Sequence, residues 1–311
     1  MIQASQSSQV AHTFRRMVNR LALSLSLALV TIVHEFAIFW AFTWRDWTTT
    51  IIPGTMYAIA AVRSLPVTLP LQSIALGLGR TLVYLILLIY TFTSSNQISG
   101  VAEDRINKPD RPIPSGRITL RGAYIRWYAS TAAFLILGAA EGVLHWTVLW
   151  VLLTIAQNFT AFGKHWFTRN AVFITFGTLC IMQPMWAQFA PTNPHEWQWV
   201  LTLSVLSGIL FQVQDFRDIV GDRAIGRNTL PLALGERSSR RVMAVLFALT
   251  PLLSSAIDFT SGYWGCGFGL GMFYLAYRIL QGTSKEYDHQ TYMMFTYLFF
   301  CGCIAVHMVF P

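Results

Sequence analysis

The sequence predicts an all-α fold, a multi-pass transmembrane helical bundle with about nine spanning helices. Three observations support this. Hydrophobic residues make up 54% of the 311 residues and charged residues only 12%, about half the charged fraction of soluble proteins. Apolar segments of about 20 residues, the length that crosses a bilayer, recur along the chain. Basic residues gather in a few of the connections between these segments, as they do beside membranes.

This composition excludes several classes of protein. A soluble enzyme would need more charge on its surface. The net charge of +8 is spread over short loops, which fits orientation in a membrane better than nucleic-acid binding. The four cysteines lie in apolar segments, with spacings that fit neither a zinc site nor a small disulfide scaffold. The lipid bilayer is the expected partner, and nothing indicates a nucleic acid or a protein partner.

The first element is an N-terminal segment, residues 1–45, which precedes a membrane domain expected over residues 46–311. Its first twenty residues are polar, and the apolar run that follows has no small-residue cleavage site. We therefore expect an uncleaved helix over 21–44. His34 and Glu35 fall in the middle of this helix. We expect it to lie in the membrane interface and not to cross the bilayer.

Nine apolar segments then follow in the membrane domain. They are 50–72, 74–95, 119–140, 143–162, 168–189, 197–213, 241–258, 260–281 and 289–310. The first of them is the weakest candidate, because it contains Arg63, Pro66 and Pro70. Elsewhere proline and glycine mark the breaks between segments.

Basic residues predict which connections lie on the same side of the membrane. The loops 96–118 and 214–241 and the short turn 163–169 are all rich in arginine or lysine. Two spans separate each from the next, so all three are expected on one face, the cytosolic one. A basic N-terminus on that face requires an even number of spans before Asn96. Segments 50–72 and 74–95 supply two, which is why 21–44 is not expected to cross.

The chemistry is expected on this face. The second loop contains Asp215, Asp218 and Asp222. Asp218 and Asp222 are four residues apart and share one face of a helix, and Asp215 can join them. Two ionised carboxylates repel each other unless a cation lies between them. Mg²⁺ is the expected cation, because it takes one or two carboxylates together with substrate phosphates.

The first loop adds oxygen ligands from Asn96, Glu103 and Asp104. Either loop alone is typical of a solvated membrane boundary. The pair on one face, each rimmed with arginine, favours a polyanion held by metal on one side and by guanidinium groups on the other.

Two sequence segments resemble those of a known family. "DRINKPDRPIPSG", beginning at Asp104, and "GDRAIGRNTLP", beginning at Gly221, resemble the UbiA-type intramembrane prenyltransferase superfamily. The resemblance extends from about residue 45 to the C-terminus. It implies nine helices around a central cavity under a polar cytosolic cap. It also implies an isoprenyl diphosphate substrate, bound through Mg²⁺ by two Asp-rich motifs.

The first of these motifs is eroded here. The family pattern is Asn followed by three Asp, and the matching residues in this chain are Asn96, Gln97, Gly100 and Asp104. Two carboxylates are missing, and Glu103 stands beside the third. The second motif is intact at Asp218 and Asp222. The expected metal ligands are therefore Asn96, Glu103, Asp104, Asp215, Asp218 and Asp222, of which Asp104, Asp218 and Asp222 are expected to be essential for catalysis.

The resemblance also implies substrate contacts. A family lysine that meets the diphosphate matches Lys164, with Arg169 nearby, and the loop arginines Arg105, Arg111 and Arg223 are expected to assist. Below the head group, aromatic rings would stabilise a carbocation. The candidates close to the motifs are Tyr90, Phe92, Phe159, Phe162, Phe211 and Phe216. Of these, we expect Phe159 and Phe211 to contact the substrate.

Two reactions fit this site. A terpene cyclase lets the double bonds of the substrate capture the cation, whereas an aromatic prenyltransferase passes the cation to an acceptor. The eroded motif resembles fungal membrane-bound cyclases such as the sesquiterpene cyclase of fumagillin biosynthesis. It therefore favours a Mg²⁺-dependent cyclase that releases diphosphate from farnesyl diphosphate. The expected location is the endoplasmic reticulum, with the active site facing the cytosol. The alternatives are an aromatic prenyltransferase and a transporter or binding protein for anionic lipids.

Overall fold

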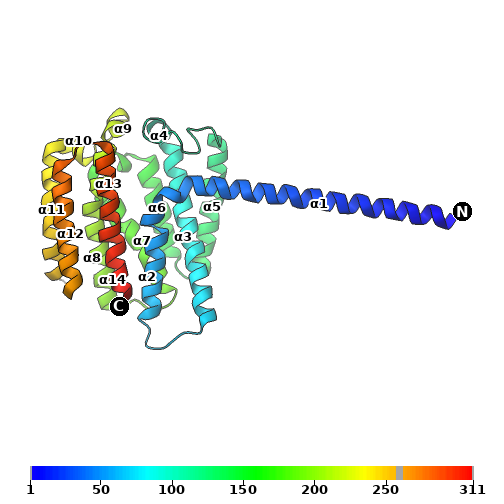
Figure 1. The fold of residues 1–311 in the computed structure, drawn as a ribbon, viewed down its shortest axis with the longest axis horizontal. Coiled ribbons are helices and arrows are strands. Elements are labelled where there is room, and N and C mark those ends of the chain that lie inside the picture. Colours follow the sequence, from blue (N-terminus) through cyan, green and yellow to red (C-terminus); the bar gives the residue numbers. More distant parts are fainter. Residues whose placement is uncertain (1, 257–261, 310–311) are drawn as a thin grey trace.

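The computed structural model describes residues 2–256 and 262–309, and every regular element in these ranges is helical (Figure 1). The described residues contain no β-strand, only an isolated bridge between His165 and Asn228. The all-α prediction is confirmed.

The main body is a bundle of long helices that run side by side (Figure 1). These are α2 (Ile51–Arg63), α3 (Leu71–Ser99), α5 (Leu120–Ala140), α6 (Leu144–Phe159), α7 (Phe173–Ala187), α8 (Pro194–Leu210), α11 (Glu236–Ala256), α12 (Gly262–Gln281) and α13 (Lys285–Phe295), the last continued by η5 (Thr296–Cys301) and α14 (Gly302–Val309). Each of the nine predicted apolar segments overlaps one of these helices or helix runs, although residues 64–70 of the first segment are not helical. Residues 257–258, 260–261 and 310 of the predicted segments lie outside the described residues.

Fewer helices meet the length and hydropathy expected of a membrane span. In the described part of the chain, four helical stretches are long and apolar enough to cross a bilayer: Arg20–Thr49, Leu71–Ser99, Pro194–Arg217 and Lys285–Met308. Ile51–Arg63 and Leu144–Phe159 are apolar but shorter. The predicted total of about nine spans is therefore not established by this criterion.

The N-terminal helix α1 (Ile2–Thr43) extends sideways from the bundle, across the direction of the other helices (Figure 1). Its C-terminal end is attached, because Ile38 and Phe42 are buried against Ile98 and Trp127. Its leucine-rich part is exposed on all sides, and Arg20–Thr49 qualifies as a span by length and hydropathy. The interfacial position of residues 21–44 stays a prediction.

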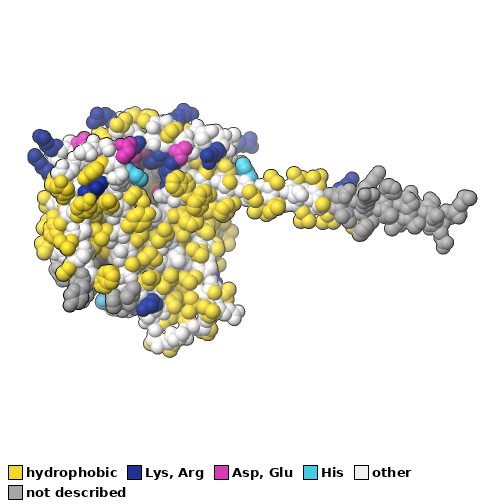
Figure 2. Space-filling view, in the orientation of Figure 1, with side chains coloured by type: hydrophobic (Ala, Val, Ile, Leu, Met, Phe, Trp, Pro, Cys, Tyr) yellow, Lys and Arg dark blue, Asp and Glu magenta, His cyan; other side chains and the backbone are white. Residues whose placement is uncertain are grey.

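Short elements gather at one end of the bundle (Figure 1). They are η1 (Trp44–Thr49), α4 (Val101–Asn107), η2 (Ala161–Lys164), η3 (Phe167–Val172), η4 (Phe211–Arg217), α9 (Ile219–Ala224) and α10 (Leu230–Leu234). Figure 2 shows most acidic and basic side chains of the visible face at this end and mainly hydrophobic side chains along the bundle. We call this end the cap.

Contacts between the three basic connections hold the cap together. Arg227 pairs with Glu103, which joins the second loop to the first. The backbone N–H of Asn228 donates to Lys164 O at 2.8 Å, and the Trp166 N–H donates to Asn228 O at 2.8 Å, which joins the second loop to the turn. The prediction that all three connections lie on one face is confirmed.

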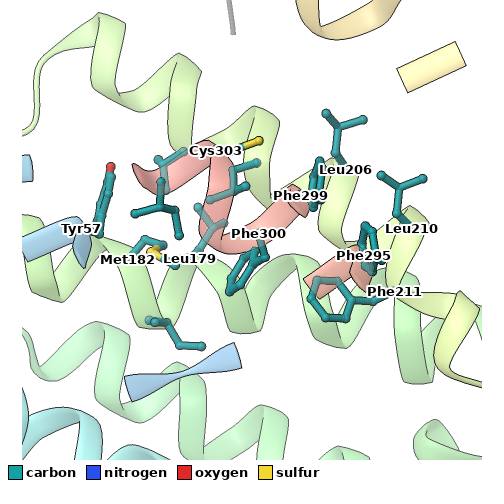
Figure 3. Packing of buried hydrophobic residues seen from close by; sticks show 14 of the residues in the cluster. Tyr57, Leu179, Met182, Leu206, Leu210, Phe211, Phe295, Phe299, Phe300 and Cys303 are labelled. Atoms are coloured by element: carbon teal, nitrogen blue, oxygen red, sulfur yellow. The ribbon is translucent and has the colours of Figure 1, made fainter. Parts of the chain in front are cut away.

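Aromatic packing below the cap positions the interior. The Phe211 ring lies 4.9 Å from Phe295 and 5.5 Å from Phe300, centroid to centroid. Figure 3 shows these rings converging from η4, α13 and η5. Edge-on contacts of this kind favour fixed ring orientations, so one wall of the interior is rigid.

Candidate active site

A cavity of about 690 Å³ lies between the cap and the apolar interior. Its lining is contributed by η1, α3, α6, η3, α7, η4 and α13 with η5, together with residues at the end of α4 and beyond it. On η3 and α7 the lining residues recur every three or four positions from Asn170 to Ile181. At 1.5 Å per residue this stripe is about 16 Å long, and it runs from the polar end of the lining into the apolar part.

The cavity changes character along this direction. Near the cap its lining is charged or polar: Asn96, Asn107, Lys108, Arg111, Gln157, Arg169, Asn170, Gln214, Arg217 and Asp218. Further in, aromatic and aliphatic side chains line it: Ile89, Phe92, Trp150, Phe173, Ile174, Ile181, Phe211 and Phe300. The arrangement suits a molecule with an anionic head and a hydrocarbon chain.

On the first side of the head region, Arg111 faces the cavity and pairs with Asp104. Its Nη1 donates to both oxygens of Asp104, at 2.7 and 2.9 Å, and lies 3.4 Å from Asn96 Oδ1. Asp104 is 1% exposed, and burial raises the pKa of its carboxyl although Arg111 opposes this. Asp104 thus orients an arginine that itself faces the cavity.

On the second side, Asp218 faces the cavity between two cations. Arg217 Nε lies 3.4 Å from its Oδ2. Burial opposes ionisation of Asp218, but Lys108 and Arg217 hold its pKa below the ordinary value. Burial lowers the pKa of Lys108, and Asp218 counteracts this. The Arg217 guanidinium carbon also lies 4.1 Å from the centroid of the Tyr292 ring, and its Nη1 lies 3.0 Å from His289 Nδ1.

An ion-pair cluster joins the two motifs behind the lining. Arg227 Nη1 lies 2.5 Å from Glu103 Oε2 and 3.0 Å from Asp222 Oδ1. Asp222 is 1% exposed, and burial raises its pKa although Arg169 and Arg227 lower it. Gly221 allows the close approach of α4, because a Cβ at this position would lie 1.9 Å from the Asn107 side chain.

The Asp215 carboxylate accepts a hydrogen bond from η3, which lies between α6 and α7. Asn170 Nδ2 donates to Asp215 Oδ2 at 2.6 Å, and Gln214 donates to Asn170 in turn. The charge of Arg169, on the same turn, acts on Asp215, Asp218 and Asp222 alike. The three carboxylates of the second motif therefore have different hydrogen-bond or ion-pair partners but share the electrostatic attraction of Arg169.

The structure brings some of the predicted site residues to the cavity and leaves others outside. Asn96, Arg111, Arg169, Asp218 and Phe211 line it. The side chains of Glu103, Asp104, Asp215 and Asp222 are buried behind that lining. The remaining four are exposed and lie outside the lining: Lys164, Arg105, Arg223 and Phe159. Their substrate-binding roles stay predictions.

Several cavity residues were missed from the sequence. Lys108 and Arg217 belong to the loops 96–118 and 214–241, and their closeness to acidic residues in the sequence could have indicated a role at the site. His289 and Tyr292 come from α13, where no local pattern indicates a polar site. Of the aromatic candidates, Phe92 also lines the cavity.

The residues fit a magnesium ion that shares its ligands with a substrate. Among the described residues, no group of three His, Cys, Asp or Glu side chains could hold a metal on its own. Asp222 Oδ2 is buried and has no hydrogen-bond partner, and Asp218 faces the cavity. Such a sparse carboxylate set matches the chemistry of Mg²⁺, which commonly completes its shell with water and phosphate oxygens.

Comparison with known proteins identifies the family. The model described as UbiA prenyltransferase family matches residues 47–300. The chain belongs to this family. It is 41% identical to the diterpene cyclase eriG of Hericium erinaceus, over 86% of this chain and 87% of that protein. It is 35% identical to the polyprenyl transferase eriF of the same organism, over 86% and 93% of the two chains.

The predicted resemblance to the fumagillin cyclase is confirmed at a lower level. The chain is 26% identical to fumagillin beta-trans-bergamotene synthase af520 of Aspergillus fumigatus, over 62% of this chain and 71% of that protein. A solved UbiA homolog from Archaeoglobus fulgidus, bound to GPP and Mg²⁺, has the same fold. Its TM-score is 0.59 at 14% identity, and the match covers 86% of this chain and 99% of that one. This UbiA-family protein is an integral membrane protein, and its relatives are enzymes of the superfamily.

Proposed function

We propose that this UbiA-family protein is a membrane terpene cyclase that ionises a prenyl diphosphate and cyclises the resulting carbocation. The observation that carries the proposal is the two-part cavity, in which a cationic head region opens directly into an aromatic interior. The similarity to the diterpene cyclase eriG and to the bergamotene synthase supports the same reaction.

Cations in the head region bind and stabilise the diphosphate. Arg111, Arg169, Arg217 and Lys108 line this region, and charged donors to phosphate oxygens make strong hydrogen bonds. Asp218 and Asp222 would hold Mg²⁺, with Asn96 facing the same region. When bound, this ion neutralises charge on the leaving diphosphate. The GPP and Mg²⁺ in the Archaeoglobus homolog support this assignment.

The interior protects the cation that remains after the carbon–oxygen bond breaks. Phe92, Trp150 and Phe173 line it together, with the Phe92 and Phe173 rings 5.3 Å apart and nearly parallel. Aromatic faces attract a cation without reacting with it as a base would. The second motif, its arginines and these rings therefore act in sequence along the cavity.

Farnesyl diphosphate is the proposed substrate. Its extended chain has about 12 main-chain carbons and spans roughly 14 Å with carbon–carbon bonds of about 1.5 Å. The 12-residue stripe from Asn170 to Ile181 is about 16 Å long. Its polar end belongs to the head group, so the chain has to fold to fit the apolar part. The similarity to a diterpene cyclase makes geranylgeranyl diphosphate, which is one isoprene unit longer, the natural comparison substrate.

The test uses purified protein with Mg²⁺ and each diphosphate in turn, without any acceptor. We expect release of inorganic diphosphate together with a cyclic hydrocarbon or alcohol, and faster turnover of the farnesyl substrate. Asp218→Asn is the matched inactive control. The cyclase proposal fails if diphosphate release requires an aromatic acceptor. Aromatic prenyl transfer is the second candidate function, favoured by the similarity to the polyprenyl transferase eriF, and it would then take its place. A proposed location in the endoplasmic reticulum, with the cap facing the cytosol, is tested by glycosylation mapping of the cap loops.

A further inference from the structure

Three buried side-chain atoms on residues that line the cavity lack hydrogen-bond partners. They are Asn107 Nδ2, Arg169 Nε and Gln157 Oε1. Leaving a buried polar atom unpaired costs free energy, so such atoms point to a ligand that completes them. Two of the three are donors and one is an acceptor.

The two donors and the acceptor need different partners. Diphosphate oxygens accept hydrogen bonds, so they suit Asn107 and Arg169. They cannot satisfy the Gln157 carbonyl oxygen, which is itself an acceptor. The partner of Gln157 Oε1 is therefore a donor or a positive charge. Gln157 is 8% exposed, so bulk water does not supply it.

The position of Gln157 indicates which positive charge it faces. The next residue, Asn158, donates to Ser95 at 2.7 Å and accepts from Asn96 at 3.2 Å, which places this end of α6 beside the head region. Trp150 lies two helical turns further in on the same face of α6 and lines the aromatic part. Gln157 thus stands at the boundary between head group and hydrocarbon chain, where the first carbon of a prenyl diphosphate would lie.

The backbone around Gln157 is held rigidly. Gly163 packs so closely that a Cβ on it would lie 1.8 Å from the Gln157 main-chain oxygen. Trp150 Nε1 donates to Leu88 O at 3.0 Å, which fixes α6 against α3. A dipole held in place before reaction stabilises developing charge without a reorganisation cost.

We propose that the Gln157 side-chain carbonyl is a catalytic group that stabilises the allylic carbocation as it forms. The carbon–oxygen bond of the diphosphate breaks, its electron pair leaves with the diphosphate oxygen, and positive charge develops on the allylic carbons. The negative end of the amide dipole faces this charge without forming a bond to it. The proposal rests on the proposed ionisation of a prenyl diphosphate.

The test compares Gln157→Leu and Gln157→Met with wild-type protein. Gln183→Leu is the control, because Gln183 is equally buried in α7 but lies outside the cavity lining. Diphosphate release from farnesyl diphosphate is measured, and so is binding of the non-ionisable farnesyl thiolodiphosphate. We expect kcat to fall roughly 100-fold in both Gln157 variants, as for loss of one electrostatic contact in other enzymes. The Kd of the analogue should change less than threefold, and the control should retain its kcat.

Two results would overturn the proposal. One is a kcat within threefold of wild type in folded Gln157→Met, with folding checked by thermal unfolding in detergent. The other is a rise in the Kd of the analogue that matches the loss of turnover, because Gln157 would then bind the ground state. Failure of the cyclase proposal itself gives a different result, namely wild-type protein that needs an acceptor. In that case, diphosphate release with the acceptor present still decides the role of Gln157.

Discussion

Arg227 is predicted to hold the two acidic motifs together. Replacing it by methionine keeps the length of the side chain and removes its charge. Arg227, Glu103 and Asp222 side chains are only 12%, 9% and 1% exposed, so the small values measured for surface ion pairs do not apply. Removing one partner of a buried pair costs about 3–5 kcal/mol, because the remaining charges are left uncompensated.

This cost should fall on the cap and leave the bundle folded, since α4 and α9 are short and meet at the cluster. Amide hydrogen exchange of peptides covering residues 100–107 and 219–226 measures local opening. With 1.4 kcal/mol for each factor of ten, exchange should become roughly 100- to 4,000-fold faster. Arg223→Met is the matched control, because Arg223 is an exposed arginine on α9, four residues before Arg227.

Adding Glu103→Gln to Arg227→Met removes one of the two uncompensated carboxylates. This double variant should regain about half of the lost free energy of cap closure, because one buried charge remains. Exchange within threefold of wild type in Arg227→Met would refute the reasoning. The carboxylates would then be compensated without the arginine.

Further predictions concern the head region and the interior. Asp218→Ala and Asp222→Ala should each abolish turnover while the protein stays folded, because loss of a cation ligand removes several kcal/mol of transition-state stabilisation; diphosphate release and thermal unfolding check this. EDTA should stop turnover and Mg²⁺ should restore it, and activity that persists in chelator would contradict the assignment of carboxylate ligands. Burial raises the pKa of Asp222, and cation binding needs the ionised form, so activity should rise with pH through this raised pKa. Arg227→Met removes a charge that lowers that pKa, so the acidic limb of the pH–rate profile should move to higher pH. Gly177→Val should shorten the usable cavity, because a Cβ there would already lie 3.2 Å from Trp150. In competition between geranyl and farnesyl diphosphates, turnover should shift towards the shorter geranyl substrate. An unchanged preference would contradict the placement of the hydrocarbon chain beside Gly177.

Local patterns in the sequence predicted the helices and the common face of the three loops. Apolar length and the positions of basic residues reflect the bilayer directly, so each predicted segment overlaps a helix among the described residues. The spacing of Asp215, Asp218 and Asp222 predicted one acidic cluster, and Arg169 acts on all three. The sequence was less informative about span number, because Ile51–Arg63 is short and ends at the residue that weakened the prediction.

Contacts between distant segments could not be predicted. Arg217 meets His289, 72 residues further along the chain, and α13 has no local pattern that indicates this. In the turn at 163–169, Lys164 matches the family lysine and Arg169 lies nearby. The backbone pairing of Lys164 and His165 with Asn228 leaves the Lys164 side chain exposed, while Arg169, one turn of η3 further on, reaches the cavity. Only the tertiary pairing decides between the two.

The eroded first motif has a physical explanation in the attachment of α1. Gln97 is 1% exposed, and its Nε2 donates to Phe42 O at 3.1 Å, which ties α3 to the end of α1. An aspartate at this position would place an acceptor against an acceptor, with no donor for either. At Gly100, which ends α3, a Cβ would lie 2.8 Å from Asn96 O, so any larger side chain would be crowded.

The two lost carboxylates therefore change how the head group is held. The cavity lining contains six lysine and arginine side chains and only two aspartates among the described residues. Binding of a diphosphate then depends mainly on these cations, whereas ionisation still needs an ion on the leaving group. A farnesyl thiolodiphosphate should accordingly bind in EDTA with an affinity close to that in Mg²⁺, although turnover is lost. Higher ionic strength should weaken this binding, because salt screens the attraction between the diphosphate and the cations of the partly open head region. Loss of binding when the metal is removed would show instead that the metal and the remaining carboxylates, and not the six lysine and arginine side chains, hold the substrate.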